Sequence, residues 1–101
     1  MKGHKKMDSN STNVSKDLYN LILDRKANPV DGSYTNYLFD KGIEKIGKKV
    51  GEEAIEAIIS ASRGDKDNTV LELADLFYHA LVMMAQMGIT PEEVEEELKK
   101  R

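Results

Sequence analysis

Apolar residues recur along this chain at steps of three and four, which is the spacing of one face of an α-helix. No stretch alternates between apolar and polar residues as a half-buried strand does. The pattern predicts two long helices, over residues 44–62 and 67–88, joined by a short link at Gly64. A link this short predicts that the two helices are antiparallel neighbours. The fold class indicated is all-α, as an antiparallel helical bundle.

Shorter elements are predicted before the two long helices. A first helix is expected over residues 16–26, with Ser15 as its N-cap residue. Residues 34–43 are expected to form a short helix or a turn, because Gly42 interrupts the pattern there.

The end of the chain carries a strong helix-start signal. Gly88 closes the second long helix, and Thr90 then serves as the N-cap residue of a new one. Pro91 occupies the first helical position and Glu93 completes a capping box, so a short last helix is predicted.

The segment 67–88 is apolar on nearly all sides, as a helix buried in a core is. Polar residues interrupt it at steps of three, four and seven, along one helical face: Glu72, Asp75, His79 and Gln86. A bare carboxylate does not tolerate burial, so it must be paired, protonated or bound to a cation. For His79 the prediction is a hydrogen-bonded core residue, with a contact to substrate or metal as the alternative.

Two pairs of carboxylates lie on the two long helices with the same spacing. Glu53 and Glu56 are three positions apart and share a helix face, as do Glu72 and Asp75. In an antiparallel hairpin the four groups can face one another, and without a cation they would repel strongly. Mg²⁺ prefers oxygen ligands of this kind together with phosphate oxygens. The chemistry suggested is metal-assisted attack of water on a phosphate.

Simpler explanations exist for each of these charged groups. Glu53 and Glu56 could belong to a solvated helix face, and Glu72 lies in the first turns of its helix, where it could complement the helix dipole. Lys48 and Lys49 precede the acidic pair and could bind phosphate, or they could pair with the carboxylates one turn further along.

Composition narrows the possible functions further. The chain has 101 residues with a formal net charge of −3, which fits one small domain and does not suggest nucleic-acid binding. It contains no cysteine, so disulfides and thiolate metal sites are excluded. No uninterrupted apolar run approaches the roughly 18 residues of a membrane span. We expect residues 1–13 to form a disordered polar tail, residues 14–101 to form the domain, and the location to be cytoplasmic.

Three motifs in this order carry a resemblance to a known family. The acidic residues Glu52-Glu53-x-x-Glu56, followed by Glu72-x-x-Asp75, resemble the metal motif of the MazG-like all-α nucleotide pyrophosphohydrolases. Within that superfamily, the stretches at residues 32–35, 48–56 and 72–79 resemble phosphoribosyl-ATP pyrophosphohydrolase of histidine biosynthesis; they read GSYT, KKVGEEAIE and ELADLFYH.

The resemblance implies an all-α bundle that is completed by dimerisation and requires Mg²⁺, with Mn²⁺ as a possible substitute. It implies that Glu53, Glu56, Glu72 and Asp75 are metal ligands. Glu52 and Glu53 would be the catalytic residues, with Glu52 orienting water or a second ion.

For the reaction, the resemblance implies hydrolysis of N1-(5-phosphoribosyl)-ATP to N1-(5-phosphoribosyl)-AMP and pyrophosphate. The substrate contacts that it implies are Ser33, Tyr34, Thr35, Lys48 and Lys49.

Two other functions remain open at the level of the sequence. A house-cleaning nucleoside triphosphate pyrophosphohydrolase of the same superfamily would share the metal site and differ in the pocket for the base and sugar. A non-catalytic helical dimer would use the acidic stripe only to bind ions or a basic partner.

Overall fold

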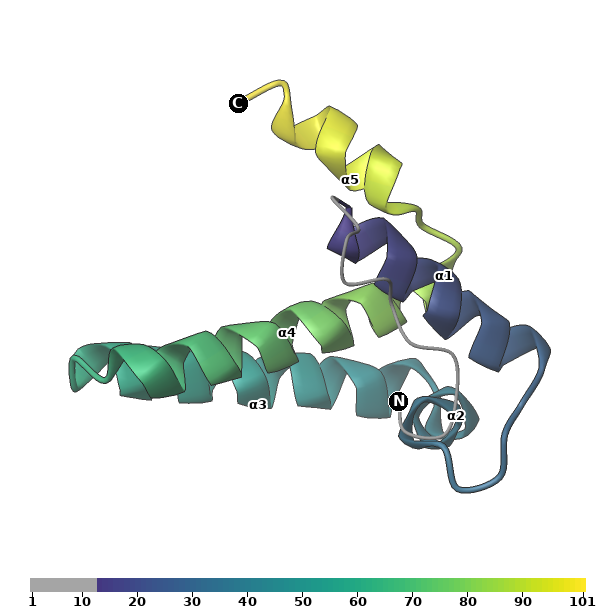
Figure 1. Ribbon diagram of the computed structural model, residues 1–101, viewed down its shortest axis with the longest axis horizontal. Helices are drawn as coiled ribbons and strands as arrows, with labels where there is room; N and C mark the ends of the chain where they lie inside the picture. The colour runs from purple at the N-terminus through teal and green to yellow at the C-terminus, as the bar shows by residue number, and fades with distance from the viewer. Residues whose placement is uncertain (1–12) are drawn as a thin grey trace.

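The computed structural model describes residues 13–101, and residues 1–12 of the predicted tail lie outside the described range. In the described part the chain forms only helices, which confirms the predicted all-α fold (Figure 1). The elements are α1 (Val14–Ala27), α2 (Tyr34–Lys41), α3 (Ile43–Ser62), α4 (Lys66–Met87) and α5 (Pro91–Leu98).

The helices α3 and α4 form a long antiparallel hairpin, as the short link predicted (Figure 1). The chain reverses at Gly64, whose φ of 70° lies in the left-handed region that favours glycine. The two helices pack against each other along nearly their whole length, so side chains of α3 and α4 face one another across the hairpin.

The hydrophobic core lies at one end of this hairpin, where α1 and α2 pack against it (Figure 1). Tyr19 of α1 also donates a hydrogen bond from its hydroxyl to the carbonyl oxygen of Ile89, at 2.7 Å. Lys26 donates to the carbonyl oxygen of Ala85 at 3.1 Å. The core residues come from four helices: Tyr19, Ile22, Leu38, Ile46, Leu81, Val82 and Ala85.

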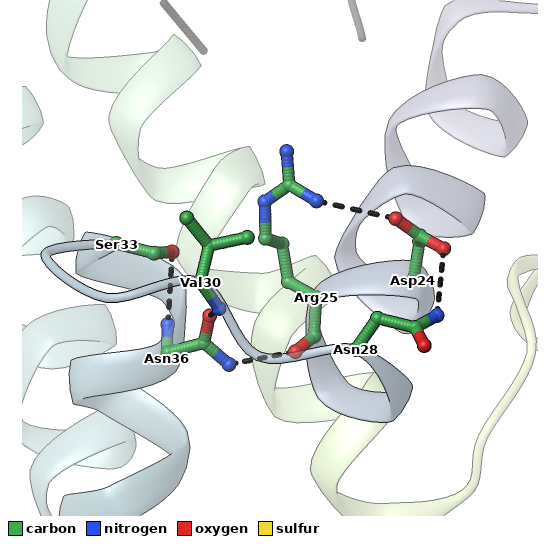
Figure 2. A network of polar contacts seen from close by, with 6 residues as sticks. All are labelled: Asp24, Arg25, Asn28, Val30, Ser33 and Asn36. Carbon is green, nitrogen blue, oxygen red and sulfur yellow. Dashed lines mark hydrogen bonds and ion pairs between the residues drawn. The ribbon is translucent and has the colours of Figure 1, made fainter. Parts of the chain in front are cut away.

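A network of polar contacts fixes the loop between α1 and α2 (Figure 2). The side-chain nitrogen Nδ2 of Asn36 donates to the carbonyl oxygen of Arg25 at 2.6 Å. The side-chain oxygen Oδ1 of Asn36 accepts from the backbone N–H of Val30 at 2.9 Å. Ser33 caps α2, because its hydroxyl accepts from the backbone N–H of Asn36 at 3.2 Å. Helix α2 therefore begins at a defined place relative to α1.

The helix ends agree with the sequence in some places and differ in others. The capping box of Thr90 and Glu93 at the start of α5 is confirmed. The N-cap of α1 is Asn13 rather than Ser15, since the Asn13 side chain accepts from the backbone N–H of Lys16 at 3.0 Å.

The expectation that the 67–88 helix is buried all round is wrong for a single chain. Only the second half of α4 is packed in the core, and Phe77 is 66% exposed. On α3, the buried side carries Glu53, Ala57 and Ser60, whereas Ile55, Ile58 and Ile59 are exposed. The exposed large apolar side chains of the hairpin are Ile43, Ile55, Ile58, Ile59, Val70, Leu71, Leu73, Phe77 and Met87.

Candidate metal and substrate site

Three of the predicted ligands come together across the α3–α4 hairpin. Carboxylate oxygens of Glu53, Glu56 and Glu72 all lie within 4.8 Å of one another. Glu53 and Glu56 are one turn apart on α3, and Glu72 reaches them from α4, as the antiparallel arrangement requires. We call these three residues the acidic cluster.

The acidic cluster has a buried base and an accessible rim. Glu53 is only 7% exposed, whereas Glu56 is exposed and Glu72 is half-buried. The Oε1 atom of Glu53 is buried and has no hydrogen-bond partner among the described residues. An unpartnered buried carboxylate oxygen is costly, so this atom is a candidate ligand for a cation.

The carboxylates of the acidic cluster affect the pKa of Glu72. Loss of solvent, followed by the nearby carboxylates of Glu53 and Glu56, raises the pKa of Glu72 above its usual value. A divalent cation would remove the part of this shift that comes from the neighbouring carboxylates, because it neutralises like charges that otherwise repel.

Asp75 and Glu52 lie beside the acidic cluster. Asp75 is exposed on α4 and is not among the three converging groups. Glu52 is half-buried and its Oε1 lies 3.4 Å from the Nζ of Lys49. Their predicted roles as metal ligand and catalytic residue stay predictions.

The two adjacent lysines differ in their surroundings. Lys48 is exposed, whereas Lys49 is half-buried and pairs with Glu52 and with Oε2 of Glu53, the latter at 3.6 Å. Desolvation lowers the pKa of Lys49, but the Tyr34 phenol and the two carboxylates outweigh it and raise the pKa overall. Lys49 is therefore a cation held at the edge of the acidic cluster.

Tyr34, at the start of α2, connects this region to the core of α4. Its hydroxyl lies 2.8 Å from Nε2 of His79, and the other ring nitrogen of His79 lies 2.7 Å from the carbonyl oxygen of Asp75. His79 is buried, which agrees with its prediction as a hydrogen-bonded core residue. Burial raises the pKa of Tyr34; Lys49 lowers it, and the charges of Glu53 and Asp75 raise it again. These charges therefore lie close to the Tyr34 hydroxyl.

The other two predicted residues of the loop have different positions. Ser33 is half-buried and lines an open pocket of ≈ 550 Å³ together with Tyr34, Tyr37 and the loop that precedes α2. Thr35 is buried instead, and its hydroxyl makes a short hydrogen bond with the hydroxyl of Tyr78. The substrate roles predicted for Ser33 and Thr35 remain predictions.

Sequence reasoning passed over two residues that organise this region. Tyr78 packs its ring edge-on against His79, with ring centroids 5.1 Å apart, and Asn36 anchors the loop that carries Ser33 and Tyr34. Tyr78 stood next to His79 in the quoted motif, so the motif itself could have found it. Asn36 had no such signal, because its partners are backbone groups.

The fold and the site together define a class of protein: an all-α protein with an antiparallel helix pair that presents converging carboxylates. Residues 15–101 match the family described as phosphoribosyl-ATP pyrophosphohydrolase. The chain belongs to this family.

Known relatives agree with that assignment. The phosphoribosyl-ATP pyrophosphatase of Streptococcus thermophilus is 56% identical over 83% of this chain and 81% of that protein. The phosphoribosyl-ATP pyrophosphatase of Clostridium acetobutylicum is 50% identical over 94% of this chain and 84% of its own length. The histidine biosynthesis bifunctional protein HisIE of Thermoanaerobacter pseudethanolicus is 49% identical over 89% of this chain, and the match covers 42% of that protein.

Proposed function

We propose that this protein hydrolyses N1-(5-phosphoribosyl)-ATP to N1-(5-phosphoribosyl)-AMP and pyrophosphate, the second step of histidine biosynthesis. One observation carries the proposal. A chain of this family gathers three carboxylates across two helices and leaves a buried oxygen of Glu53 without a partner. That arrangement suits an enzyme that acts on a phosphate chain with a divalent cation.

The residues present fit Mg²⁺, with Mn²⁺ as a substitute. Every converging donor is a carboxylate oxygen, which both cations accept, and the unpartnered Oε1 of Glu53 points to a missing positive charge. Glu53, Glu56 and Glu72 would hold the ion, with Asp75 as a fourth ligand. Bound there, the ion would neutralise charge on the triphosphate and make an attacking water more acidic.

The remaining residues would bind and orient the substrate. Lys49 offers a cation beside the acidic cluster, and Lys48 adds a second one that is fully accessible. Glu52 would orient the attacking water. In the reaction the water oxygen bonds to phosphorus, the α–β anhydride bond breaks, and its electron pair leaves with pyrophosphate.

The open pocket lined by Ser33 and Tyr34 would take the organic part of the substrate. Tyr34 belongs to both regions, since it lines the pocket and lies close to the charges of Lys49 and Glu53. Ser33 lies beside it with a hydroxyl, and Tyr37 stacks on Tyr34 with ring centroids 6.0 Å apart. Such a surface suits a flat base and a hydroxyl-rich sugar.

A homodimer would cover the exposed apolar face of the α3–α4 hairpin. Helix α4 is long and apolar enough, by length and composition alone, to cross a membrane, which differs from the expectation drawn from the sequence. Its carboxylates Glu72 and Asp75 argue against a lipid environment, because charged groups at such depth are costly. We propose instead that a second copy packs on this face and that the protein acts in the cytoplasm.

The decisive experiment measures pyrophosphate release. Phosphoribosyl-ATP should be cleaved with Mg²⁺ or Mn²⁺ present and should not be cleaved in excess chelator. ATP, dUTP and dCTP serve as competing substrates, and they should be poor because they lack the ribose phosphate carried by the base. Equal cleavage of these nucleotides would replace the proposal with a house-cleaning pyrophosphohydrolase. If none of these nucleotides is cleaved, the remaining explanation is a non-catalytic helical dimer.

A further inference from the structure

Both ring nitrogens of His79 are engaged inside the protein. Nδ1 lies 2.7 Å from the carbonyl oxygen of Asp75, one turn earlier in α4. Nε2 lies 2.8 Å from the hydroxyl of Tyr34, which belongs to α2. Since His79 is only 5% exposed, neither nitrogen is available to a ligand.

For a neutral imidazole, these two contacts determine where the protons lie. A carbonyl oxygen can only accept a hydrogen bond, so Nδ1 must carry the proton that points to Asp75. In a neutral imidazole the other nitrogen then has no proton and accepts. The hydroxyl of Tyr34 therefore donates its single proton to Nε2 of His79.

This arrangement of protons limits the hydrogen bonds that the Tyr34 hydroxyl can form with a substrate or water. With its proton committed to His79, the hydroxyl oxygen has only lone pairs left to offer. An ionised phosphate oxygen is also an acceptor, so the two cannot form a hydrogen bond. The oxygen of Tyr34 can instead accept from a donor, and the attacking water is a donor that the proposed reaction requires.

We propose that His79 is a positioning residue that makes the Tyr34 hydroxyl an acceptor for the attacking water. This proposal rests on the proposed function, and it assigns Tyr34 to the water rather than to the phosphates. One water proton bonds to Tyr34 while a lone pair of the water oxygen attacks phosphorus. The other proton passes to the carboxylate of Glu52, which orients the same water, as the α–β anhydride bond breaks and pyrophosphate leaves with the electron pair.

Kinetic measurements on four variants test this assignment. Tyr34→Phe keeps the ring and should lower kcat about 10- to 100-fold while KM changes less than about twofold. His79→Asn can still reach the Asp75 carbonyl but not Tyr34, so it should lower kcat similarly. The double variant should be no slower than Tyr34→Phe, because both changes remove the same interaction. His79→Gln, whose side-chain oxygen reaches toward Tyr34, should recover part of the rate.

The matched control is Tyr19→Phe. It also removes one hydrogen bond of a tyrosine hydroxyl, the one to the carbonyl oxygen of Ile89, and Tyr19 belongs to the hydrophobic core rather than to the proposed site. Its kcat should stay within about twofold of wild type if a general loss of stability is not the cause of the losses.

A spectroscopic measurement tests the proton positions without any activity. Long-range ¹H–¹⁵N spectra of the metal-free protein should show His79 with a protonated Nδ1 and a bare Nε2. The chain has two histidines, and His79→Asn identifies the signal. In Tyr34→Phe the Nε2 signal should shift. A protonated Nε2 would overturn the proposal.

Some outcomes separate this proposal from the proposed function. If the wild-type protein cleaves another nucleoside triphosphate, the substrate assignment is wrong, and the same variants tested on that substrate still decide the role of Tyr34. A loss that appears in KM alone, or additive losses in the double variant, would overturn the role of Tyr34. A wild-type protein inert toward every triphosphate overturns both.

Discussion

Lys49 and Glu53 are one turn apart on α3, and the Nζ of Lys49 lies 3.6 Å from Oε2 of Glu53. The other oxygen of that carboxylate, Oε1, is buried and has no partner in the described part of the chain. One oxygen of Glu53 is therefore paired with a cation of the protein, and the other is the oxygen that we propose as a metal ligand. In the proposed site, Glu53 therefore lies between Lys49, which would bind phosphate, and the divalent cation.

Lys49 should matter more to substrate binding than Lys48. Lys49→Ala should raise the KM for phosphoribosyl-ATP about tenfold, because it removes a half-buried cation beside the acidic cluster. Lys48→Ala changes an exposed charge and should raise KM by less than about threefold. Steady-state kinetics at low and high salt would check this, and both effects should be larger at low salt. Equal effects of the two changes would contradict it.

Neutral isosteres of the carboxylates should abolish turnover without unfolding the protein. Glu56→Gln and Asp75→Asn should each lower kcat by at least about a hundredfold, because each removes one anionic oxygen donor from the proposed metal site. Stability of the metal-free protein should stay equal or rise, since repulsion within the site falls.

Circular dichroism melts in chelator and pyrophosphate assays in Mg²⁺ measure the two effects. Glu44→Gln is the control, because Glu44 is an exposed carboxylate at the start of the same helix. Near-wild-type rates in both site variants would refute the assigned roles.

The metal-free protein should lose some stability as the pH rises above about 4.5. The pKa of Glu72 in the folded protein is raised above its ordinary value of 4.5, first by desolvation and then by Glu53 and Glu56. Between these two pKa values the folded state binds more protons than the unfolded state, so the free energy of unfolding falls with rising pH. The contribution is present at low pH and is lost once the pH passes the raised pKa.

Urea melts in excess chelator across this pH range would measure the effect. Glu72→Gln removes the titrating group, so its stability should depend less on pH than that of the wild type. A pH dependence identical in the two proteins would show that Glu72 is not the cause.

A charged residue on the exposed face of the hairpin should break the dimer. Phe77→Glu places a carboxylate where the proposed second copy packs, and burying it there without a partner is costly. Sedimentation velocity at micromolar concentration should give a dimer for wild type and a monomer for this variant. Leu23→Glu, an exposed position on α1 away from the hairpin, should remain dimeric. A monomeric wild-type protein would contradict the dimer proposal.

Removing the Asn36 side chain should destabilise the protein by about 2 kcal/mol, because the amide satisfies two backbone groups at once. Figure 2 shows both contacts, to the carbonyl of Arg25 and the N–H of Val30. Urea denaturation of Asn36→Ala would measure the loss. Asn28→Ala is the control: its side chain makes one exposed bond to Asp24, so it should cost less than about 0.5 kcal/mol. If Asn36→Ala lowers the free energy of unfolding no more than Asn28→Ala does, Asn36 does not stabilise the protein through this loop.

The sequence by itself determined the helices and much of where they end. Helical periodicity and the capping residues Thr90, Pro91 and Glu93 act within a few residues of one another, so they can be read without knowing the fold. The spacing of Glu53 and Glu56 also fixed them to one helix face.

Only the tertiary structure decided which faces of α3 and α4 pack against each other. Hydrophobicity favoured burial of Ile55 and Ile58, yet α3 turns Glu53 and Ala57 toward α4 and leaves the isoleucines outside. The rotation of one helix against another depends on the packing of all its neighbours at once, and no local pattern encodes that sum.

The same reason explains the details of the site that the sequence could not give. The approach of Glu72 to Glu53, and not of Asp75, depends on how far the two helices are shifted along each other. The contact between Tyr34 and His79 joins residues 45 positions apart, with α2, α3 and the first part of α4 between them. Contacts at such separation exist only once the whole chain has packed, because each depends on the placement of every element between them.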